Sequence, residues 1–304
     1  MNSIDKESLF FGINNVEIEH ARLITVGIPW DHSSSYRKGS SEAPNYIRQA
    51  TTSSLYNPFS EKNTDLKEQF QLYDYGNINN ENANPLLYQK AVLSAINEIY
   101  SKNRTCYFLF LGGDHLSTYF SFSSLVESGF YSTENSGIIY LDAHPDLYDI
   151  YEGNKFSHAC VLRRIIDETN INPSNIVQVG IRAVTPEQVE YAHNNGIKMV
   201  SRKEFQSSGP EGTAKVIRGI FDKNIDKIYL SVDMDVLDPS FAPGVGNPEP
   251  GGLITTEVID FIHNISKLPL HSFDIVECCP KYDHSHVTAF IAAKTIKETL
   301  SIMI

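Results

Sequence analysis

Apolar residues recur along the chain in two patterns that alternate from one segment to the next. In the first pattern, short runs that are apolar throughout, or apolar at every second position, end in polar clusters. Such runs predict strands. They are ARLITVGIP, CYFLFLGGD, GIIYLDAHPD, NIVQVGIR, KIYLSVDMD and HSFDIVE.

In the second pattern, apolar residues recur at helical spacing. The clearest predicted helix follows Asn84, a capping residue, and has Pro85 at its first position. Further helices are predicted in FSHACVLRRIIDE, PEQVEYAHNNG, EGTAKVIRGIFD, TTEVIDFIHNIS and HVTAFIAAKTIKETL. Strands that alternate with helices are typical of a parallel sheet with helices on both faces. We therefore expect an α/β fold in a single domain, residues 1–304.

Composition narrows the classes of partner. The 304 residues include 25 basic and 37 acidic side chains, a net charge of −12, which disfavours nucleic acid and anionic membranes and favours cationic ligands. No apolar run approaches the roughly 20 residues of a membrane span, and the start, MNSIDKESLFFG, lacks signal-peptide character. The cysteines form no CxxC pair, so we expect a reduced, cytoplasmic protein. They are Cys106, Cys160, Cys278 and Cys279.

Polar residues that suit metal ions follow four of the predicted strands. In parallel sheets, ligands bind at the carboxyl ends of the strands, so these residues are expected to meet at one rim. Where the chain stays extended past the strand, side chains two positions apart point to one face. The residues at these four strand ends are Asp114, His115, Asp142, His144, Asp146, Asp233, Asp235 and Glu277.

Buried carboxylates need a compensating positive charge, and no Lys or Arg lies close to these in sequence. Two divalent cations would balance four aspartates. Carboxylates with two imidazoles and no cysteine suit Mn²⁺ best, with Co²⁺, Ni²⁺ or Zn²⁺ as replacements. An isolated DxD is ordinarily a turn or cap and an isolated GGDH a loop, so the prediction rests on the conjunction of three motifs.

These motifs resemble the ureohydrolase family, which contains arginases, agmatinases, formiminoglutamases and guanidinobutyrases. The resemblance covers nearly the whole chain, through VGIPWDHSSSYRKGSSEAP, GGDHLS, DAHPD, SVDMDVLDPSFAPGVGNPEPGGL, DIVECCPKYD and TAFIAAKTI. LDPSFAPG, NPEPGGL, DIVE and PKYD look most like agmatinases. The resemblance implies an arginase-like, three-layer α/β/α fold with a mostly parallel sheet of about eight strands, and a homotrimer or homohexamer.

The resemblance also implies two Mn²⁺ ions per subunit that share two bridging aspartates, Asp142 and Asp233. One ion would add His115 and Asp146, and the other His144 and Asp235. The six implied metal ligands are His115, Asp142, His144, Asp146, Asp233 and Asp235.

Three residues would act on the substrate. Asp146 would also orient the attacking water, and His158 in KFSHACVLRR matches the position of the family's proton-shuttling histidine. Glu277 in DIVE matches the carboxylate that holds the guanidinium group. A histidine near its ordinary pKa can protonate the leaving amine, and charge-assisted hydrogen bonds to Glu277 would align the guanidinium carbon. The structural alternatives are a capping histidine and a strand-end salt bridge.

The loop LYDIYEGNKFSH bears on substrate choice. Asp149 and Glu152 would repel a substrate carboxylate and attract a second amine, although Asn154 and Ser157 remain as donors. This favours agmatine, cleaved to urea and putrescine in polyamine biosynthesis. The alternatives are aminopropylagmatine, arginine, guanidinobutyrate or formiminoglutamate as substrate, a single-metal zinc deacetylase, and a non-catalytic family member.

Cys278 directly follows Glu277 in the sequence. It either packs in the interior or, if exposed as a thiolate, takes up soft metals or is oxidised.

Overall fold

The structure is a computed structural model that describes residues 10–52, 57–79, 81, 83–221 and 224–303. Residues 1–9, which hold most of the segment without signal-peptide character, lie outside the described residues. Among the described residues, no helix combines the length and the apolar composition that crossing a membrane requires.

Eight strands form one sheet in the order β2-β1-β3-β8-β7-β4-β5-β6, and every neighbouring pair is parallel. This confirms the parallel sheet expected from the sequence. The strands are β1 (Leu23–Ile28), β2 (Leu72–Asn77), β3 (Tyr107–Gly112), β4 (Ser136–Leu141), β5 (Ile176–Ile181), β6 (Lys198–Ser201), β7 (Lys227–Asp233) and β8 (Leu270–Val276).

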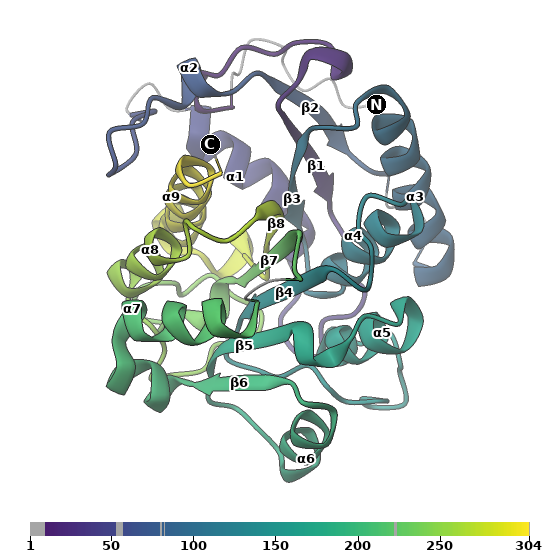
Figure 1. Cartoon of the computed structure of the whole chain (residues 1–304), viewed down its shortest axis with the longest axis vertical. Coiled ribbons are helices and arrows are strands. Elements are labelled where there is room, and N and C mark those ends of the chain that lie inside the picture. The colour runs from purple at the N-terminus through teal and green to yellow at the C-terminus, as the bar shows by residue number, and fades with distance from the viewer. Residues whose placement is uncertain (1–9, 53–56, 80, 82, 222–223, 304) are drawn as a thin grey trace.

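Helices cover both faces of the sheet, so the fold has three layers (Figure 1). Helices α1, α7, α8 and α9 lie on one side, and α3, α4 and α5 on the other. The described helices are α1 (Ala43–Thr52), α2 (Leu66–Gln69), α3 (Pro85–Lys102), α4 (Leu116–Glu127), α5 (Val161–Thr169), α6 (Pro186–Asn195), α7 (Arg202–Ile220), α8 (Thr255–Asn264) and α9 (Val287–Ser301).

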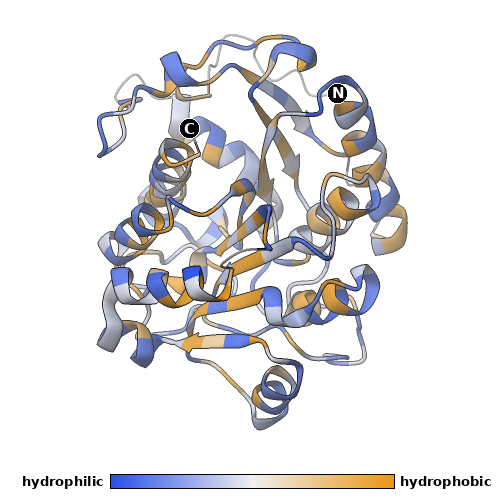
Figure 2. Cartoon of the chain, in the orientation of Figure 1, coloured by the Kyte–Doolittle hydropathy of each residue, from blue (hydrophilic) through white to orange (hydrophobic). Residues whose placement is uncertain are grey.

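The sheet separates two hydrophobic core layers. Successive residues of β3 point to opposite faces, so Phe108 and Phe110 join the layer beneath α3–α5, whereas Leu109 and Leu111 join the layer beneath α1 and α7–α9. Figure 2 shows apolar residues concentrated along the central strands and on the helix faces turned toward them. Burial on both faces explains why these strands read as nearly continuous apolar runs.

All six predicted strands are present. The two strands that the sequence pattern missed, β2 and β6, are the edges of the sheet, and most of their residues are only partly buried. The predicted cap of α3 is confirmed, because the Asn84 side chain accepts hydrogen bonds from the backbone N–H groups of Leu86 and Leu87. Helix α7 begins at Arg202, earlier than predicted, after a capping box formed by Ser201 and Glu204.

The four central strands, β3, β8, β7 and β4, are direct neighbours in the sheet. Each is followed by one of the polar motifs singled out in the sequence. The order of the strands therefore brings motifs that are far apart in the chain to one stretch of the carboxyl rim, which is where α/β sheets bind their ligands.

Candidate metal centre and its cavity

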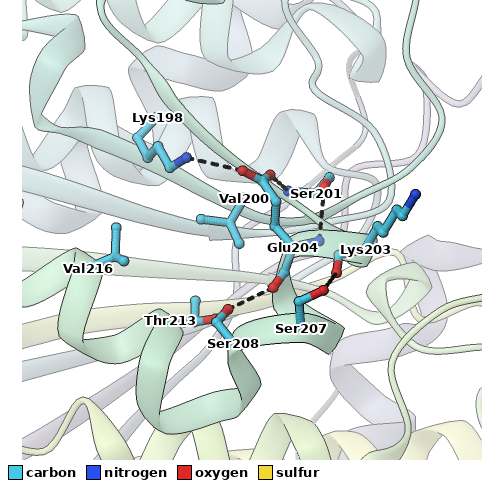
Figure 3. A pocket seen from close by; sticks show the side chains of 9 residues that line it. All are labelled: Lys198, Val200, Ser201, Lys203, Glu204, Ser207, Ser208, Thr213 and Val216. Atoms are coloured by element: carbon cyan, nitrogen blue, oxygen red, sulfur yellow. Dashed lines mark hydrogen bonds and ion pairs between the residues drawn. The ribbon is translucent and has the colours of Figure 1, made fainter.

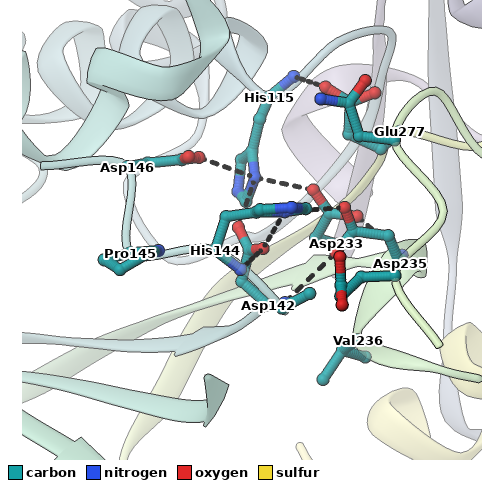
Figure 4. A network of polar contacts seen from close by, with 12 residues as sticks. His115, Asp142, His144, Pro145, Asp146, Asp233, Asp235, Val236 and Glu277 are labelled. Atoms are coloured by element: carbon teal, nitrogen blue, oxygen red, sulfur yellow. Dashed lines mark hydrogen bonds and ion pairs between the residues drawn. The ribbon is translucent and has the colours of Figure 1, made fainter. Parts of the chain in front are cut away.

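Six carboxylate and imidazole side chains converge at this rim (Figure 4). Nδ1 of His115 lies 2.9 Å from Oδ2 of Asp233 and 3.0 Å from Oδ2 of Asp142, and Oδ2 of Asp146 lies 3.5 Å away. The potential ligand atoms of His115, Asp142 and Asp233 all lie within 4.8 Å of one another, a spacing that suits a metal ion.

A second group shares Asp142 with the first. Nδ1 of His144 lies 3.1 Å from Oδ2 of Asp235 and 3.4 Å from Oδ1 of Asp142. These three side chains also place ligand atoms within 4.8 Å of one another. The structure thus brings together all six residues predicted as ligands: five form two adjacent groups that share Asp142, and Asp146 lies beside His115.

Local turns, rather than extended chain, aim the DAHPD side chains. Strand β4 ends at Leu141, Oδ1 of Asp142 accepts the backbone N–H of His144 at 2.6 Å, and Asp146 has a φ of +51°. The chain therefore does not stay extended past β4, which was the condition for the three side chains to point to one face, but the side chains still converge. Asp233 uses a similar turn, in which its Oδ1 accepts the N–H of Asp235 at 2.7 Å.

The electrostatics of the cluster favour a bound cation. Burial, with the nearby charge of Asp142, raises the pKa of Asp146 to about 7. Burial and neighbouring carboxylates likewise raise the pKa of Asp233 well above its ordinary value. Among the described residues, Oδ2 of Asp142 is buried without a hydrogen-bond partner. Divalent cations would offset these like charges, and the oxygen and imidazole donors fit such ions.

A hydrogen-bonded chain behind His115 sets the direction of its ring. Nε2 of His115 lies 2.9 Å from Oγ of Ser231, and this hydroxyl donates to Oδ1 of Asp274 at 2.8 Å. Because the Ser231 hydroxyl donates its hydrogen to Asp274, its oxygen can only accept, and the Nε2–H of His115 is the donor. The proton is thus held on Nε2, and the Nδ1 lone pair is directed toward Asp142 and Asp233.

His158 and Glu277 form a second polar unit beside the cluster. Nδ1 of His158 lies 2.8 Å from Oε1 of Glu277, which also accepts the backbone N–H of His115. Burial opposes protonation of His158, but the charge of Glu277 outweighs it and raises the pKa of His158 to about 9. Burial likewise opposes ionisation of Glu277, but His158 and these hydrogen bonds outweigh it and lower the pKa of Glu277.

The other nitrogen of His158 contacts the loop that follows β1. Nε2 lies 3.2 Å from the backbone N–H of Ser35 and 2.8 Å from its Oγ. The N–H favours an unprotonated Nε2, whereas the hydroxyl can donate to that nitrogen or accept from its proton. The hydroxyl of Ser35 therefore suits both protonation states of His158, whereas its N–H suits only an unprotonated Nε2.

These residues line one cavity of about 350 Å³. His144, Asp146, Asp233 and Asp235 contribute from the cluster, together with His158 and Glu277. Sequence reasoning assigned no role to several further lining residues. All five named below lie in segments already quoted, which are VGIPWDHSSSYRKGSSEAP, LYDIYEGNKFSH, PEQVEYAHNNG and NPEPGGL. The further lining residues include Ser35, Tyr148, Tyr151, Gln188 and Asn247.

Asp149 and Glu152 lie outside this lining. The side chain of Asp149 is 56% exposed and pairs with Arg164, whose Nη2 lies 2.6 Å from its Oδ1. Glu152 is exposed on a turn with a φ of +49°. Substrate binding by Asp149 and Glu152 stays a prediction.

Cys278 is fully buried, and its burial raises the pKa of the thiol well above its ordinary value. It therefore packs in the interior, and the alternative of an exposed thiolate is wrong.

A separate hollow beside β6 and α7 holds no comparable chemistry (Figure 3). Its polar groups bind one another: Glu204 accepts the N–H of Ser201 and pairs with Lys198 at 3.4 Å. These contacts cap α7 and secure the sheet edge, so the cluster at the carboxyl rim is the better candidate for function.

The chain is similar in sequence and structure to enzymes that act on amidino groups. The profile of the Arginase family matches residues 21–301. Proclavaminate amidinohydrolase of Streptomyces clavuligerus is 31% identical over 91% of this chain and 87% of its own. Agmatinase of Bacillus subtilis (strain 168) is 31% identical over 93% and 92%. The structure of the Streptomyces amidinohydrolase superposes with a TM-score of 0.85 at 30% identity, covering 97% of this chain and 96% of that one.

The fold and the cluster thus define a ureohydrolase-type enzyme, a metal-dependent hydrolase of C–N bonds. This chain belongs to the Arginase family.

Proposed function

We propose that the protein hydrolyses the guanidino group of agmatine to urea and putrescine, with two Mn²⁺ ions per subunit. The proposal rests on one observation: two clusters, each of one imidazole and two carboxylates, converge beside Glu277 and His158 in one cavity. The similarity to agmatinase of Bacillus subtilis supports the choice of substrate.

The residues present fit a pair of divalent ions. His115, Asp142, Asp146 and Asp233 would hold one ion, and Asp142, His144, Asp233 and Asp235 the other. Mixed carboxylate and imidazole donors suit Mn²⁺. Two such ions, when bound, supply Lewis-acid chemistry and lower the pKa of a shared water.

Glu277 would fix the guanidinium group. Its Oε1 is used by His158 and the N–H of His115, whereas its buried Oε2 has no hydrogen-bond partner among the described residues. A guanidinium N–H donor supplies that partner through a charge-assisted hydrogen bond. Binding there holds the substrate carbon in one orientation beside the metal cluster.

His158 would move the proton. The raised pKa of His158 keeps both ring nitrogens protonated near neutral pH, and the Nδ1–H stays bound to Glu277. Nε2 can therefore exchange its contact with Ser35 for the leaving nitrogen of the substrate and protonate it. Asp146, which accepts the hydroxyl of Tyr140 at 2.7 Å, would orient the attacking water.

The charge of the cavity favours an amine over a carboxylate at the far end of the substrate. Among the described residues that line the cavity there is no Lys or Arg. The carboxylates of arginine, guanidinobutyrate and formiminoglutamate would therefore lack a cationic partner, whereas agmatine and aminopropylagmatine carry amines. Two clusters of candidate metal ligands, rather than one, argue against a single-metal zinc deacetylase. Further predictions are a single domain, a homotrimer or homohexamer, cytoplasmic location and a role in polyamine biosynthesis.

The test is turnover by Mn²⁺-loaded protein. Release of urea would be measured with agmatine, aminopropylagmatine, arginine and guanidinobutyrate, and release of formamide with formiminoglutamate. Agmatine is expected to give the highest kcat/KM, and elemental analysis is expected to find two Mn²⁺ per chain. Asp233→Ala should lose both metal and activity, because Asp233 would bridge the two ions. The proposal is overturned if none of the compounds in the panel gives a product.

A further inference from the structure

Two tyrosines on the cavity wall have no role in the chemistry proposed above. Tyr148 and Tyr151 belong to the loop between β4 and α5, are half-buried, and line the cavity together with His144 and Asp146. Their ring centroids lie 5.2 Å apart, with an angle of 46° between the ring planes. The loop therefore contributes a pair of adjacent, tilted aromatic rings to the wall.

The acidic residues of the same loop do not contribute to this wall. Asp149 is directed to Arg164, and Glu152 is exposed on the turn that joins Tyr151 to Asn154. The charge that made the loop sequence look suited to an amine thus lies outside the cavity lining, and the aromatic rings lie within it.

The remaining wall is neutral. It includes Ala183, Val184 and Thr185 after β5, Gln188 from α6, and also Ser35, Ala159 and Asn247. The carboxylates among the described lining residues belong to the metal cluster and to Glu277. A cationic group bound away from the cluster and from the His158–Glu277 pair would therefore meet π-systems and neutral dipoles, and an anionic group there would meet no positive charge.

The tyrosine hydroxyls are uncommitted. Two fully buried tyrosines donate their hydroxyls within the protein: Tyr229 donates to Asp274, and Tyr131 donates to the carbonyl of Ile228. The hydroxyls of Tyr148 and Tyr151 have no hydrogen-bond partner among the described residues. The backbone N–H groups of both residues donate within the loop, to the carbonyls of Ala159 and Asn154, so the backbone that carries the two rings is anchored.

We propose that Tyr148 and Tyr151 form an aromatic subsite that holds the distal ammonium group of the substrate through cation–π contact. The inference rests on the proposed function, because it assumes that the guanidinium end lies at Glu277. It narrows the substrate class to short guanidino compounds with a cationic, rather than an anionic, distal end. A cavity of about 350 Å³ is at the small end for ligand sites, which also favours a short chain.

The experiment compares two ligands that differ at the distal end. Agmatine and 1-butylguanidine share the guanidinium group and four carbons, and butylguanidine lacks the amine. Binding would be measured by calorimetry and turnover by urea release, on Mn²⁺-loaded wild type and on Tyr148→Leu, Tyr151→Leu and the two Tyr→Phe variants. Tyr75→Leu, on edge strand β2, is the matched control.

The wild type is expected to prefer agmatine, and each Leu variant to reduce that preference by roughly 2- to 30-fold, the range for a cation–π contact. The Phe variants, which keep the ring, and Tyr75→Leu are expected to stay within about 3-fold of wild type. Equal losses for agmatine and butylguanidine in the Leu variants would overturn the subsite and leave the proposed function intact. If the wild type binds agmatine in preference to butylguanidine and the Leu variants lose that preference, but no urea is released, the subsite stands and the proposed function is overturned. Failure of protein of verified metal content to bind either ligand would overturn both.

Discussion

Nδ1 of His158 and Oε1 of Glu277 lie 2.8 Å apart, and both side chains are buried at the wall of the cavity. The pair links β8 to the turn before α5, and Oε1 of Glu277 also accepts the N–H of His115. One carboxylate thereby orients the histidine and keeps its other oxygen for a ligand.

Replacing Glu277 with Gln should weaken catalysis while preserving the metal cluster. The change removes the negative charge that would hold the guanidinium group, so kcat/KM for agmatine is expected to fall by about 100-fold or more. Steady-state urea release and Mn²⁺ content, measured on the same preparation, check this. Glu204→Gln on α7 is the matched control, and a Glu277→Gln enzyme with unchanged kcat/KM would contradict the assigned role.

The pair also predicts a pH dependence of stability in protein freed of metal. The pKa of His158 is raised to about 9 in the folded state, above the ordinary value of about 6.5. Its contribution to the free energy of unfolding is therefore complete below about pH 6.5 and is lost as the pH rises through about 9. Urea unfolding of wild type and His158→Asn over this range checks the sign. Parallel pH profiles for the two proteins would contradict it.

Removing the hydroxyl of Ser231 should weaken metal binding although Ser231 is not a proposed ligand. Without that hydroxyl, His115 loses the acceptor that holds the proton on Nε2, so Mn²⁺ affinity is expected to fall about 10- to 100-fold. Competition with a chelator, followed by elemental analysis, measures the affinity. Ser272→Ala is the control, because Ser272 is also buried in the sheet but contacts Tyr131. Equal affinities in the two variants would remove the orienting role.

Gly113 should tolerate no side chain. A Cβ atom placed there would lie 1.9 Å from the backbone carbonyl oxygen of Trp30, so Gly113→Ala must displace the chain that precedes His115. The free energy of unfolding is expected to fall by about 3 kcal/mol or more. Gly219→Ala in α7, where a Cβ meets nothing within 4 Å, should be neutral or slightly stabilising. Thermal unfolding of both variants gives the comparison.

The sequence predicted the sheet well where its strands are buried on both faces. Runs such as CYFLFLGGD are almost uniformly apolar because β3 has a helix layer on each side. The edge strands β2 and β6 are mostly only partly buried, and β6 is also short, so their patterns did not separate them from loops. The order of the strands in the sheet is set by tertiary packing, and hydrophobic periodicity carries no information about that order.

The candidate ligands were also predictable, because each lies within a short motif at a strand end. The cavity wall was harder. In LYDIYEGNKFSH the charges of Asp149 and Glu152 drew attention, whereas the structure places Tyr148 and Tyr151 in the lining and pairs Asp149 with Arg164. Which of two adjacent loop side chains points inward depends on turns such as the one at Glu152, and composition does not reveal it.

The candidate metal-binding side chains lie at or after the ends of β3, β4 and β7, and Tyr148 and Tyr151 belong to the same segment after β4 as three of them. The part of the cavity wall that follows β5, from Ala183 to Gln188, carries no candidate ligand. Substitutions after β5 can therefore redirect the enzyme to a new amidine without replacing a candidate ligand, so paralogues with different preferences are expected to diverge first in that segment.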